Sequence, residues 1–450
     1  MPSMLTDLRS AATTVITDPS ATTSYSRDQC LGVEAGVPAA VVLARSTDDV
    51  AATIATAGRH GVPVVARGSG SGLSGAANAV DGCIILDLGR MNHILDLDPI
   101  ARTARVQPGV INGDLDLAAR RHGLRYVPDP GSRAISSIGG NLATNAGGMC
   151  CAKYGVTGDH VMSITAVTGA GEIITTGAST RKNVVGLDLT RLLVGSEGTL
   201  AVFVEALVRL HPVPTAFATL AATFPDVGTA VDTVASWTSV STPMAVELMD
   251  RTTVQAVNRL TRIGLDDDAG AVVLAQFDDA DAAHAAELCA SIATANGGEA
   301  YASDDPADGE AMMAARRAAY PALEAMGATL LDDVAVAPHR LPELVGAIES
   351  IARRTGVVIG TFGHVADGNL HPTIVYDPRE SRARDAAMAA FHDILDATLA
   401  LGGSVSGEHG VGSLKTSFVT RQVGAAEVAL MHGIKRAFDP LGILNPGRAF

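Results

Sequence analysis

The chain has 450 residues, which is too long for one ordinary hydrophobic core, so we expect two or more domains. Hydrophobic residues make up 47% and charged residues 18%, a composition that excludes a disordered chain. The formal net charge of −15 argues against nucleic acid as a partner. No apolar run approaches the ~20 residues of a transmembrane helix and no signal peptide opens the chain, so we expect a soluble, cytoplasmic protein. Peripheral contact with the inner face of the membrane stays open.

The cysteines bear on metal chemistry and compartment. There are five of them, at positions 30, 83, 150, 151 and 289, and they include no C-x-x-C pair. Zinc-ribbon and iron–sulfur sites are therefore unsupported, and the odd count fits a reducing compartment.

Short strands and helices crowd the first part of the chain, a pattern typical of an α+β fold. Ser46 is expected to cap a helix that ends near Gly61, with Asp49 three residues on as a variant of the capping box. The other elements expected here are a helix over 3–16, strands over Ala40–Ala44, Val62–Val65, Cys83–Leu88 and Ala104–Gln107, a helix over Asp114–His122 closed by Gly123, and a strand over Leu200–Leu210.

A glycine-rich loop follows the strand at Val62–Val65. It runs from Arg67 to Gly75 and holds glycines at 68, 70, 72 and 75. Glycine allows positive φ and close backbone approach, and successive N–H groups in such a loop form an anion-binding concavity that suits a diphosphate. No Lys follows, which excludes a P-loop, and the next element is a strand rather than a helix, which excludes a Rossmann turn. The alternative is a tight surface turn.

The stretch Val127–Tyr154 lacks helical or strand periodicity, and a structureless segment of this length inside a compact domain is usually functional. Small polar side chains and exposed N–H groups suit a heteroaromatic ring with carbonyl and amide edges. They include Ser, Thr or Asn at 132, 136, 137, 141, 144 and 145, and glycines at 131, 139, 140, 147 and 148. A third block of this kind is Leu193–Thr199.

After about residue 213 strands and helices alternate, which indicates a separate α+β domain. The expected strands are Ala218–Phe224, Met244–Met249, Val272–Phe277, Val357–Gly363 and Leu370–Tyr376, and the expected helices are Val227–Trp237, Thr252–Arg262, Ala280–Ala295 and Glu310–Met326.

The last two strands predict a histidine pair. Asp367-Gly368 is a strong hairpin dipeptide, and a two-residue turn there pairs 366 with 369, 365 with 370, and His364 with His371. Directly opposite residues have Cβ atoms ~5 Å apart on one sheet face, so the two imidazoles could chelate one divalent metal. A hydrogen-bonded or solvated pair of histidines is the alternative.

A carboxylate and a third histidine follow in the glycine-rich turn Gly407–Gly412. Glu408 would complete a site of two histidines and one carboxylate with open positions for substrate or water. His409 points elsewhere, as the next residue, and is free to act as a base near neutral pH. The alternative is that Glu408 and His409 lie in a surface loop and cap a helix.

Four glycine blocks together resemble the FAD-binding domain of the vanillyl-alcohol oxidase / p-cresol methylhydroxylase (PCMH-type) superfamily: Arg67–Gly75, Ser137–Asn141, Thr144–Gly148 and Gly195–Thr199. The resemblance implies that the first block holds the FAD pyrophosphate and that the stretch Val127–Tyr154 surrounds the isoalloxazine. Covalent members carry a flavin-linking histidine in or near the first block, and this chain has none there, which implies non-covalent FAD. The cofactor-binding residues implied are Arg67, Gly68, Ser69, Gly70, Ser71, Gly72, Ser74, Pro130, Gly131, Ser132, Ser137, Gly139, Gly140, Asn141, Thr144, Asn145, Gly147, Gly155, Glu197, Gly198, Val202 and Asn445.

The later motifs are similar to one metal-dependent branch of that superfamily, which includes cytochrome-type D-lactate dehydrogenase, the glycolate oxidase flavoprotein subunit and D-2-hydroxyglutarate dehydrogenase. The residues are Gly363–His371, Gly407–Gly412 and the closing Phe438–Gly447. The resemblance implies an α+β fold with a PCMH-type FAD-binding domain (1–212), an α+β cap domain of the FAD-linked oxidase C-terminal type (213–420) and a C-terminal segment (421–450) that returns to the FAD domain.

The same branch implies the chemical roles. His364, His371 and Glu408 would bind a divalent metal (Zn, Mn or Fe), His409 would be the catalytic base, and Arg316 would hold the substrate carboxylate. Ala315–Ala322 lacks the tryptophan often found before that arginine. Relatives specific for 2-hydroxyglutarate carry a lysine beside the strand that matches Leu331–Val334, where this chain has none.

We therefore expect an FAD- and metal-dependent dehydrogenase of a short D-2-hydroxy acid such as D-lactate or glycolate. Electrons would pass to an external acceptor: a quinone, a cytochrome, an electron-transfer flavoprotein or a partner subunit. The alternatives are a D-2-hydroxyglutarate dehydrogenase, an oxygen-reducing FAD oxidase of the same fold and, outside this class, a metal-dependent hydrolase. A homodimer stays open.

Overall fold

The computed structural model describes residues 2–450, and its contacts divide the chain into two compact units. Of the described residues, the first unit contains 2–147, 155–213 and 408–450, and the second contains 148–154 and 214–407. The boundaries expected from the sequence, at 212 and 420, stay a prediction.

Two sheets form the centre of the first unit. The four-stranded sheet has the order β1-β2-β4-β3, and the five-stranded sheet, antiparallel throughout, has the order β5-β6-β10-β8-β9. The strands of the unit are β1 (Val15–Ile16), β2 (Ala40–Leu43), β3 (Val64–Arg67), β4 (Ile84–Asp87), β5 (Ile94–Asp98), β6 (Thr103–Val106), β7 (Leu124–Arg125), β8 (Val161–Thr168), β9 (Ile173–Gly177), β10 (Ala201–Arg209) and β11 (His211–Pro212).

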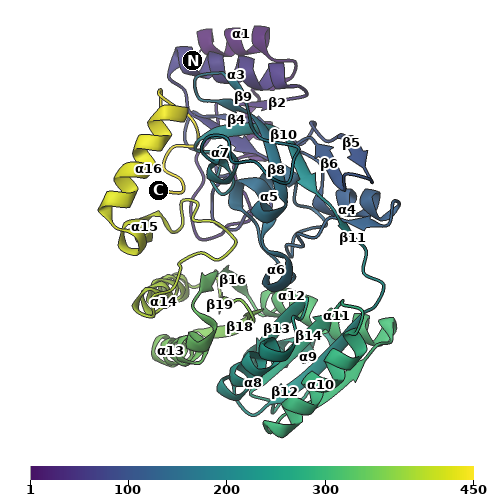
Figure 1. The fold of residues 1–450 in the computed structure, drawn as a ribbon. Coiled ribbons are helices and arrows are strands. Elements are labelled where there is room, and N and C mark those ends of the chain that lie inside the picture. The colour runs from purple at the N-terminus through teal and green to yellow at the C-terminus, as the bar shows by residue number, and fades with distance from the viewer. Residues whose placement is uncertain (1) are drawn as a thin grey trace. The chain divides into compact units, whose positions relative to one another are not determined.

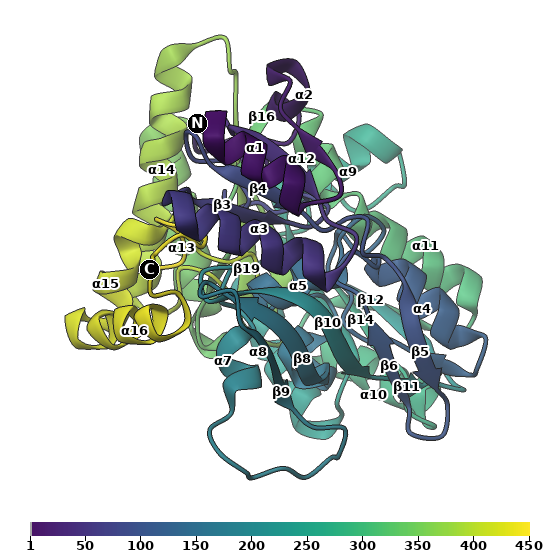
Figure 2. The same cartoon turned by 90° about the horizontal axis from the view of Figure 1, so that it is seen from above.

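Helices cover these sheets, and α1 and α3 lie side by side (Figure 2). The helices are α1 (Pro2–Ala11), α2 (Pro19–Thr23), α3 (Thr47–His60), α4 (Asn112–Arg120), α5 (Ile138–Thr144), the 3-10 turn η1 (Thr157–His160), α7 (Leu189–Leu193), α15 (Thr416–Val423) and α16 (Ala425–Phe438). Apolar side chains of α1, α3 and the parallel strands form one core, and those of α4, α5 and the five-stranded sheet form another.

One of the two hydrogen bonds predicted for the cap of α3 is confirmed. The Ser46 hydroxyl accepts the Asp49 amide, and Gly61 ends the helix in the left-handed region with φ 62°. The Asp49 carboxylate does not return the bond to Ser46, because it accepts the amides of Thr13 and Arg45 instead. The residue therefore ties the helix start to the preceding chain rather than completing a capping box.

Two expectations for the first unit are wrong in part. The helix expected over 3–16 ends at Ala11, because the β-branched run Thr13–Thr17 favours the extended conformation of β1. The stretch Val127–Tyr154 is not structureless, since Ser137 caps the two-turn helix α5 and Cys151–Tyr154 forms α6. Three strands of the five-stranded sheet, β5, β8 and β9, were not expected from the sequence.

The second unit is built on one antiparallel eight-stranded sheet. Its order is β15-β12-β14-β13-β18-β19-β16, with β17 paired to β19. The strands are β12 (Ala218–Phe224), β13 (Ala245–Asp250), β14 (Ala271–Phe277), β15 (Glu299–Ser303), β16 (Ala328–Leu331), β17 (Val334–Ala335), β18 (Val358–His364) and β19 (Asn369–Tyr376).

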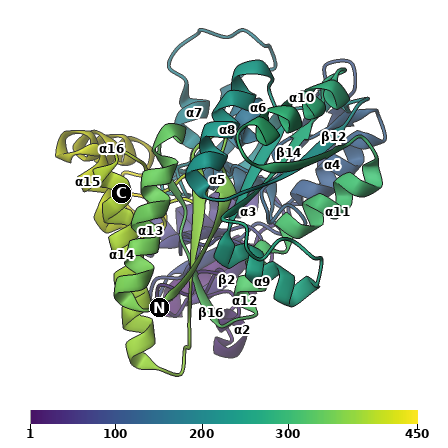
Figure 3. The same cartoon turned by 90° about the horizontal axis from the view of Figure 1, so that it is seen from below.

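Helices of the second unit pack on this sheet, and α13 and α14 lie side by side in two views (Figures 1 and 3). The helices are α6 (Cys151–Tyr154), α8 (Val227–Val240), α9 (Arg251–Thr261), α10 (Ala282–Ala295), α11 (Pro306–Arg317), α12 (Ala319–Glu324), the 3-10 turn η2 (Pro338–Arg340), α13 (Leu341–Thr355) and α14 (Ser381–Ala400). The strands and helices expected here are confirmed within a few residues, except that the helix expected over Glu310–Met326 divides at Ala318. Pro321 explains the break, because it has no N–H to continue the helical ladder and its ring clashes with the carbonyl four residues back.

The predicted register of the histidine hairpin is wrong. In the structure His364 is opposite Asn369, and Phe362 is opposite His371, so the loop has four residues, Val365–Gly368. A two-residue type I′ turn needs positive φ at both central positions, and here only Gly368 (φ 82°) meets that condition. The Asp367 carboxylate accepts the Asn369 amide and stabilises the wider turn. Both histidines still face the same side of the sheet, as diagonal rather than direct neighbours.

Among the described residues, no helix has the length and apolar character needed to cross a membrane.

Candidate active site

Glu247 is the buried carboxylate on which the polar site of the second unit is built. It lies in β13 between apolar neighbours, and its side chain is fully buried. His364 Nδ1 donates to Glu247 Oε1 over 2.6 Å, and Arg316 Nε donates to Glu247 Oε2 over 2.7 Å. One carboxylate thus fixes two residues to which the sequence analysis assigned separate roles.

The charges around Glu247 keep it ionised. Burial by itself would raise the pKa of its carboxyl, but the interactions with His364 and Arg316 outweigh burial, and the pKa is lowered. An ionised Glu247 accepts from Nδ1 of His364, so in the neutral ring Nε2 is the nitrogen that carries the lone pair.

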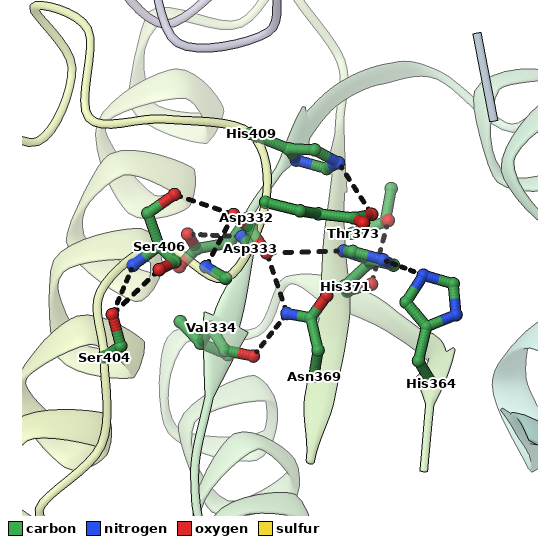
Figure 4. A network of polar contacts seen from close by, with 12 residues as sticks. Asp332, Asp333, Val334, His364, Asn369, His371, Thr373, Ser404, Ser406 and His409 are labelled. Carbon is green, nitrogen blue, oxygen red and sulfur yellow. Dashed lines mark hydrogen bonds and ion pairs between the residues drawn. The ribbon is translucent and has the colours of Figure 1, made fainter. Parts of the chain in front are cut away.

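The two histidines are brought together as the sequence predicted, although through a different register. His364 Nε2 and His371 Nε2 lie 3.4 Å apart, and both side chains are buried (Figure 4). Two nitrogens at the ~2.0–2.1 Å of a zinc–imidazole bond, held at a tetrahedral angle, lie about 3.3 Å from each other. The observed spacing therefore fits one shared ion. A carboxylate behind a metal-binding histidine is also the usual outer partner, because it sets the ring's tautomer and direction.

Arg316 is held by one edge of its guanidinium. Its Nε bonds to Glu247, and the group lies over the Phe362 ring at 4.6 Å from the centroid. Among the described residues, none accepts a hydrogen bond from its two Nη groups. These groups form the fork that binds a carboxylate with two parallel hydrogen bonds, so the geometry suits the predicted role.

Asp333 joins the histidine strand to the segment that leads to Glu408. Its Oδ1 accepts Asn369 Nδ2 at 2.8 Å, and its Oδ2 accepts the Ser406 hydroxyl at 2.8 Å and the Gly407 amide at 2.9 Å (Figure 4). The same Oδ1 lies 3.9 Å from His371 Nδ1. Residues 406–407 are thereby anchored beside the histidine pair within the second unit.

Glu408 and His409 themselves belong to the first unit. Glu408 Oε1 lies 3.6 Å from His409 Nε2, and the Ser74 hydroxyl donates to the His409 carbonyl over 3.2 Å. Their roles as third metal ligand and catalytic base stay predictions.

The glycine loop after β3 fits an anionic group. Gly70 has φ 69°, and among the described residues none accepts a hydrogen bond from the amides of residues 69–74. Arg67 Nη1 is buried at the same loop with no hydrogen-bond partner. Unused amides and an unused guanidinium nitrogen form a site with the donor chemistry that a diphosphate needs.

Three of the predicted flavin blocks meet at this loop. A Cβ on Gly68 would lie 2.3 Å from Ser137 Oγ, which places the loop against the first turn of α5. Asn445 joins the loop to the third block, because its Nδ2 donates to the carbonyls of Ala76 at 3.0 Å and Glu197 at 2.6 Å. The predicted residues gathered here are Gly68, Ser69, Gly70, Ser71, Gly72, Ser74, Ser137, Gly140, Glu197, Gly198 and Asn445, together with Val202 in the core beneath them.

The other predicted flavin residues have local partners within the unit, and their role toward FAD stays a prediction. Asn141 accepts from Asn112, Asn145 accepts the Gly158 amide, and Thr144 donates to the Gly140 carbonyl. Gly139 packs on Pro108. Pro130, Gly131 and Ser132 form a turn, and Gly155 lies against Asp159. Gly147 is the last residue of the first chain segment of this unit.

The Glu197 side chain contacts the segment after His409, and the predicted role of this residue toward FAD stays a prediction. Its carboxylate accepts the amides of Val411 and Gly412, each at 2.7 Å, so it faces the segment after His409. Burial raises the pKa of this carboxyl to about 7, against the opposing effect of the two amides and Arg448.

Sequence reasoning missed Glu247, Asp333 and Asn369. A signal was present for Glu247, since it is the one charged residue within the apolar run Met244–Met249 and a buried carboxylate needs a partner. Asp333 lies in the stretch that was examined for a missing lysine rather than for its own carboxylates. Nothing local in the sequence pairs Asn369 with Asp333.

Comparison with known proteins identifies the two domains of the chain. Residues 213–449 match the family described as FAD linked oxidases, C-terminal domain, and residues 38–177 match the FAD binding domain. The solved structure of p-cresol methylhydroxylase aligns over 100% of this chain and 96% of its own, with a TM-score of 0.85 and 19% identity, which shows a shared fold. The protein therefore has the PCMH-type FAD-binding domain and the FAD-oxidase C-terminal domain of that class of flavoproteins.

Relatives at higher identity narrow the family. The glycolate oxidase subunit GlcD of Bacillus subtilis (strain 168) is 38% identical over 419 residues, covering 92% of this chain and 89% of that protein. The D-lactate dehydrogenase of Anaerostipes hadrus is 32% identical over 425 residues, covering 91% of this chain and 89% of that one. The chain belongs to the FAD-linked oxidases, in the glycolate oxidase / D-lactate dehydrogenase family, and it is an FAD-linked oxidoreductase.

Replacing Gly70 by valine tests the diphosphate loop. The left-handed φ disfavours a β-branched residue, and the new Cβ would lie 2.0 Å from Arg67 Nη2, so we expect the purified variant to lack flavin absorbance. Gly186→Val is the control, since Gly186 has φ 75° with nothing within 4 Å of its Cβ position. A Gly70→Val protein with a full complement of FAD would exclude this loop as the diphosphate site.

Proposed function

We propose that the protein oxidises a short D-2-hydroxy acid, of the size of D-lactate or glycolate, to the 2-oxo acid in an FAD- and metal-dependent reaction. The observation that carries the proposal is the shared carboxylate of Glu247. It joins a histidine pair spaced for one ion to an arginine whose Nη groups have no acceptor among the described residues. A 2-hydroxy acid presents the two groups that such a pair of sites would recognise, a carboxylate and a neighbouring hydroxyl.

The protein's own residues would divide the work as follows. Arg316 binds the substrate carboxylate through its Nη groups and thereby fixes the position of C2. His409 takes the hydroxyl proton while the hydrogen on C2 leaves with its electron pair. When bound, FAD would supply the hydride acceptor and a divalent ion would supply a Lewis acid for the hydroxyl.

Glu408 is proposed as the third metal ligand, with His364 and His371. Support comes from the chain itself, because Glu408 follows Gly407, whose amide is bonded to Asp333, and Asp333 lies 3.9 Å from His371. One residue spans only ~3.8 Å of chain, so the anchor limits how far Glu408 can lie from the pair. Two imidazoles and a carboxylate suit Zn, Mn or Fe.

The choice of substrate rests on the names of two relatives and on the absence of one lysine. Two relatives are named for glycolate and D-lactate. Leu331–Val334 holds no lysine that could pair with a second, distal carboxylate, which favours a short acid over D-2-hydroxyglutarate.

Electrons would leave to an external acceptor: a quinone, a cytochrome, an electron-transfer flavoprotein or a partner subunit. The five cysteines include no C-x-x-C set for an iron–sulfur relay. An oxygen-reducing oxidase is the rival, and mixing the reduced enzyme with dioxygen separates the two, because an oxidase is reoxidised as fast as it turns over.

FAD is proposed to be bound without a covalent link, since Arg67–Gly75 contains no histidine. Acid precipitation of the protein should release all the flavin into the supernatant, where its absorbance is measured. Yellow colour that stays in the pellet would show a covalent bond.

The metal assignment predicts that loss of the metal stops reduction of the flavin but leaves its binding intact. Treatment with a chelator, or His371→Ala, should leave the flavin spectrum intact and stop bleaching by substrate under anaerobic conditions, because a site that loses one of three ligands no longer holds the ion against water. Metal content is measured on the same samples. His339→Ala, at an exposed histidine of the same unit, serves as the control and should behave as the parent.

His409→Ala should give a different pattern. Its metal content stays normal while the rate of flavin reduction falls roughly 10²–10⁴-fold, the range for a lost general base. The assignment of roles is wrong if this variant loses the metal, or if the chelated enzyme bleaches at the normal rate.

A further inference from the structure

Glu408 and His409, proposed as metal ligand and catalytic base, lie where the chain passes from the second compact unit to the first. The second unit ends at Gly407, and the first resumes at Glu408. A crossing of this kind would leave Glu408 and His409 on a free loop unless the backbone on each side were fixed. In the structure a buried carboxylate accepts backbone amides on each side.

Asp333 fixes the near side within the second unit. It is 1% exposed, and its Oδ2 accepts both the Gly407 amide and the Ser406 hydroxyl. The backbone is therefore anchored immediately before Glu408.

Glu197 fixes the far side within the first unit. It is 5% exposed, and its two oxygens accept the amides of Val411 (Oε1) and Gly412 (Oε2) at 2.7 Å each. A carboxylate is the group that offers both of its oxygens as acceptors, so this pair of bonds belongs to the ionised form.

Glu197 is itself rigidly placed. Its backbone has φ 51°, its amide donates to the Ala143 carbonyl over 2.8 Å, and its carbonyl accepts from Asn445. Ser74, from the glycine loop, adds a second connection: its hydroxyl donates to the His409 carbonyl, and its own carbonyl accepts the amides of Ser413 and Leu414. The segment after His409 is thus tied to residues of two predicted flavin blocks, Arg67–Gly75 and Gly195–Thr199.

We propose that Glu197, supported by Ser74, is a positioning residue that sets His409 relative to the flavin-binding loops, while Asp333 anchors the same segment from the other side. The inference rests on the proposed function, in which His409 is the base. Neither Glu197 nor Ser74 needs to touch the substrate, because each acts through the backbone that carries His409. Small displacements of a catalytic group cost much of its rate, which is why such a segment needs anchors on both sides.

The test uses Glu197→Gln, which keeps the size of the side chain but replaces one accepting oxygen by an NH₂ that cannot accept. Both oxygens of the Glu197 carboxylate accept the amides of Val411 and Gly412, so any contact of this residue with FAD would use its backbone, which the variant keeps. In the holoenzyme we therefore expect the flavin spectrum and the substrate affinity to stay as in the parent, while the limiting rate of anaerobic flavin reduction falls ~10- to 100-fold. Ser74→Ala is the second variant, with a smaller fall in the same rate. Asp226→Asn is the matched control, since Asp226 also accepts a backbone amide and a hydroxyl, those of Thr229, but at the start of α8.

Combining each change with His409→Ala distinguishes positioning from other roles. If Glu197 acts through His409, Glu197→Gln in the His409→Ala background should cause no further loss of rate, because residues that act as one unit are not additive. An equal loss in both backgrounds, a loss of bound FAD in Glu197→Gln, or an unchanged rate in the single variant would overturn the proposal. A normal rate in His409→Ala alone would instead overturn the assignment of the base, so the two failures are told apart.

Discussion

The shared carboxylate of Glu247 is the interaction on which the site in the second unit depends. It is fully buried, and it holds His364 through one oxygen and Arg316 through the other. Such a group is stable only with both partners, since removing one partner of a buried ion pair typically costs roughly 3–5 kcal/mol. The spacing between the histidine pair and Arg316 is therefore set by the width of one carboxylate.

In the first unit, backbone amides rather than charged side chains are the groups that need a partner. Among residues 2–450, none accepts a hydrogen bond from the amides of residues 69–74 in the glycine loop or from the buried Arg67 Nη1 at the same loop. Donors left unused in a half-buried loop cost stability unless a ligand accepts from them. FAD binding and the stability of this loop should therefore be coupled.

Much of the fold could be predicted because local signals decide it. The strand Val272–Phe277 follows from its apolar composition, which begins with two β-branched valines, and the start of α3 follows from the hydroxyl of Ser46. The hairpin register failed because Asp367-Gly368 was taken as a complete turn, whereas only Gly368 has positive φ. Register depends on such backbone details, which a dipeptide does not determine.

The sequence indicated candidate residues for the site, but not the contacts that connect them. Motif resemblance pointed to His364, His371, Arg316, Glu408 and His409, since each lies in a recognisable stretch. Glu247 acts from β13 and Asp333 from the connection between β16 and β17, and contacts between segments far apart in sequence are visible only in three dimensions. The partners of the motif residues therefore came from the structure alone.

The measurement that tests the central claim most directly is anaerobic mixing of the holoenzyme with each enantiomer of lactate, followed by flavin absorbance. The account predicts rapid bleaching by D-lactate, little or none by L-lactate, and formation of one 2-oxo acid for each flavin reduced. A yellow, metal-loaded enzyme that no short 2-hydroxy acid bleaches, or that responds equally to both enantiomers, would contradict it.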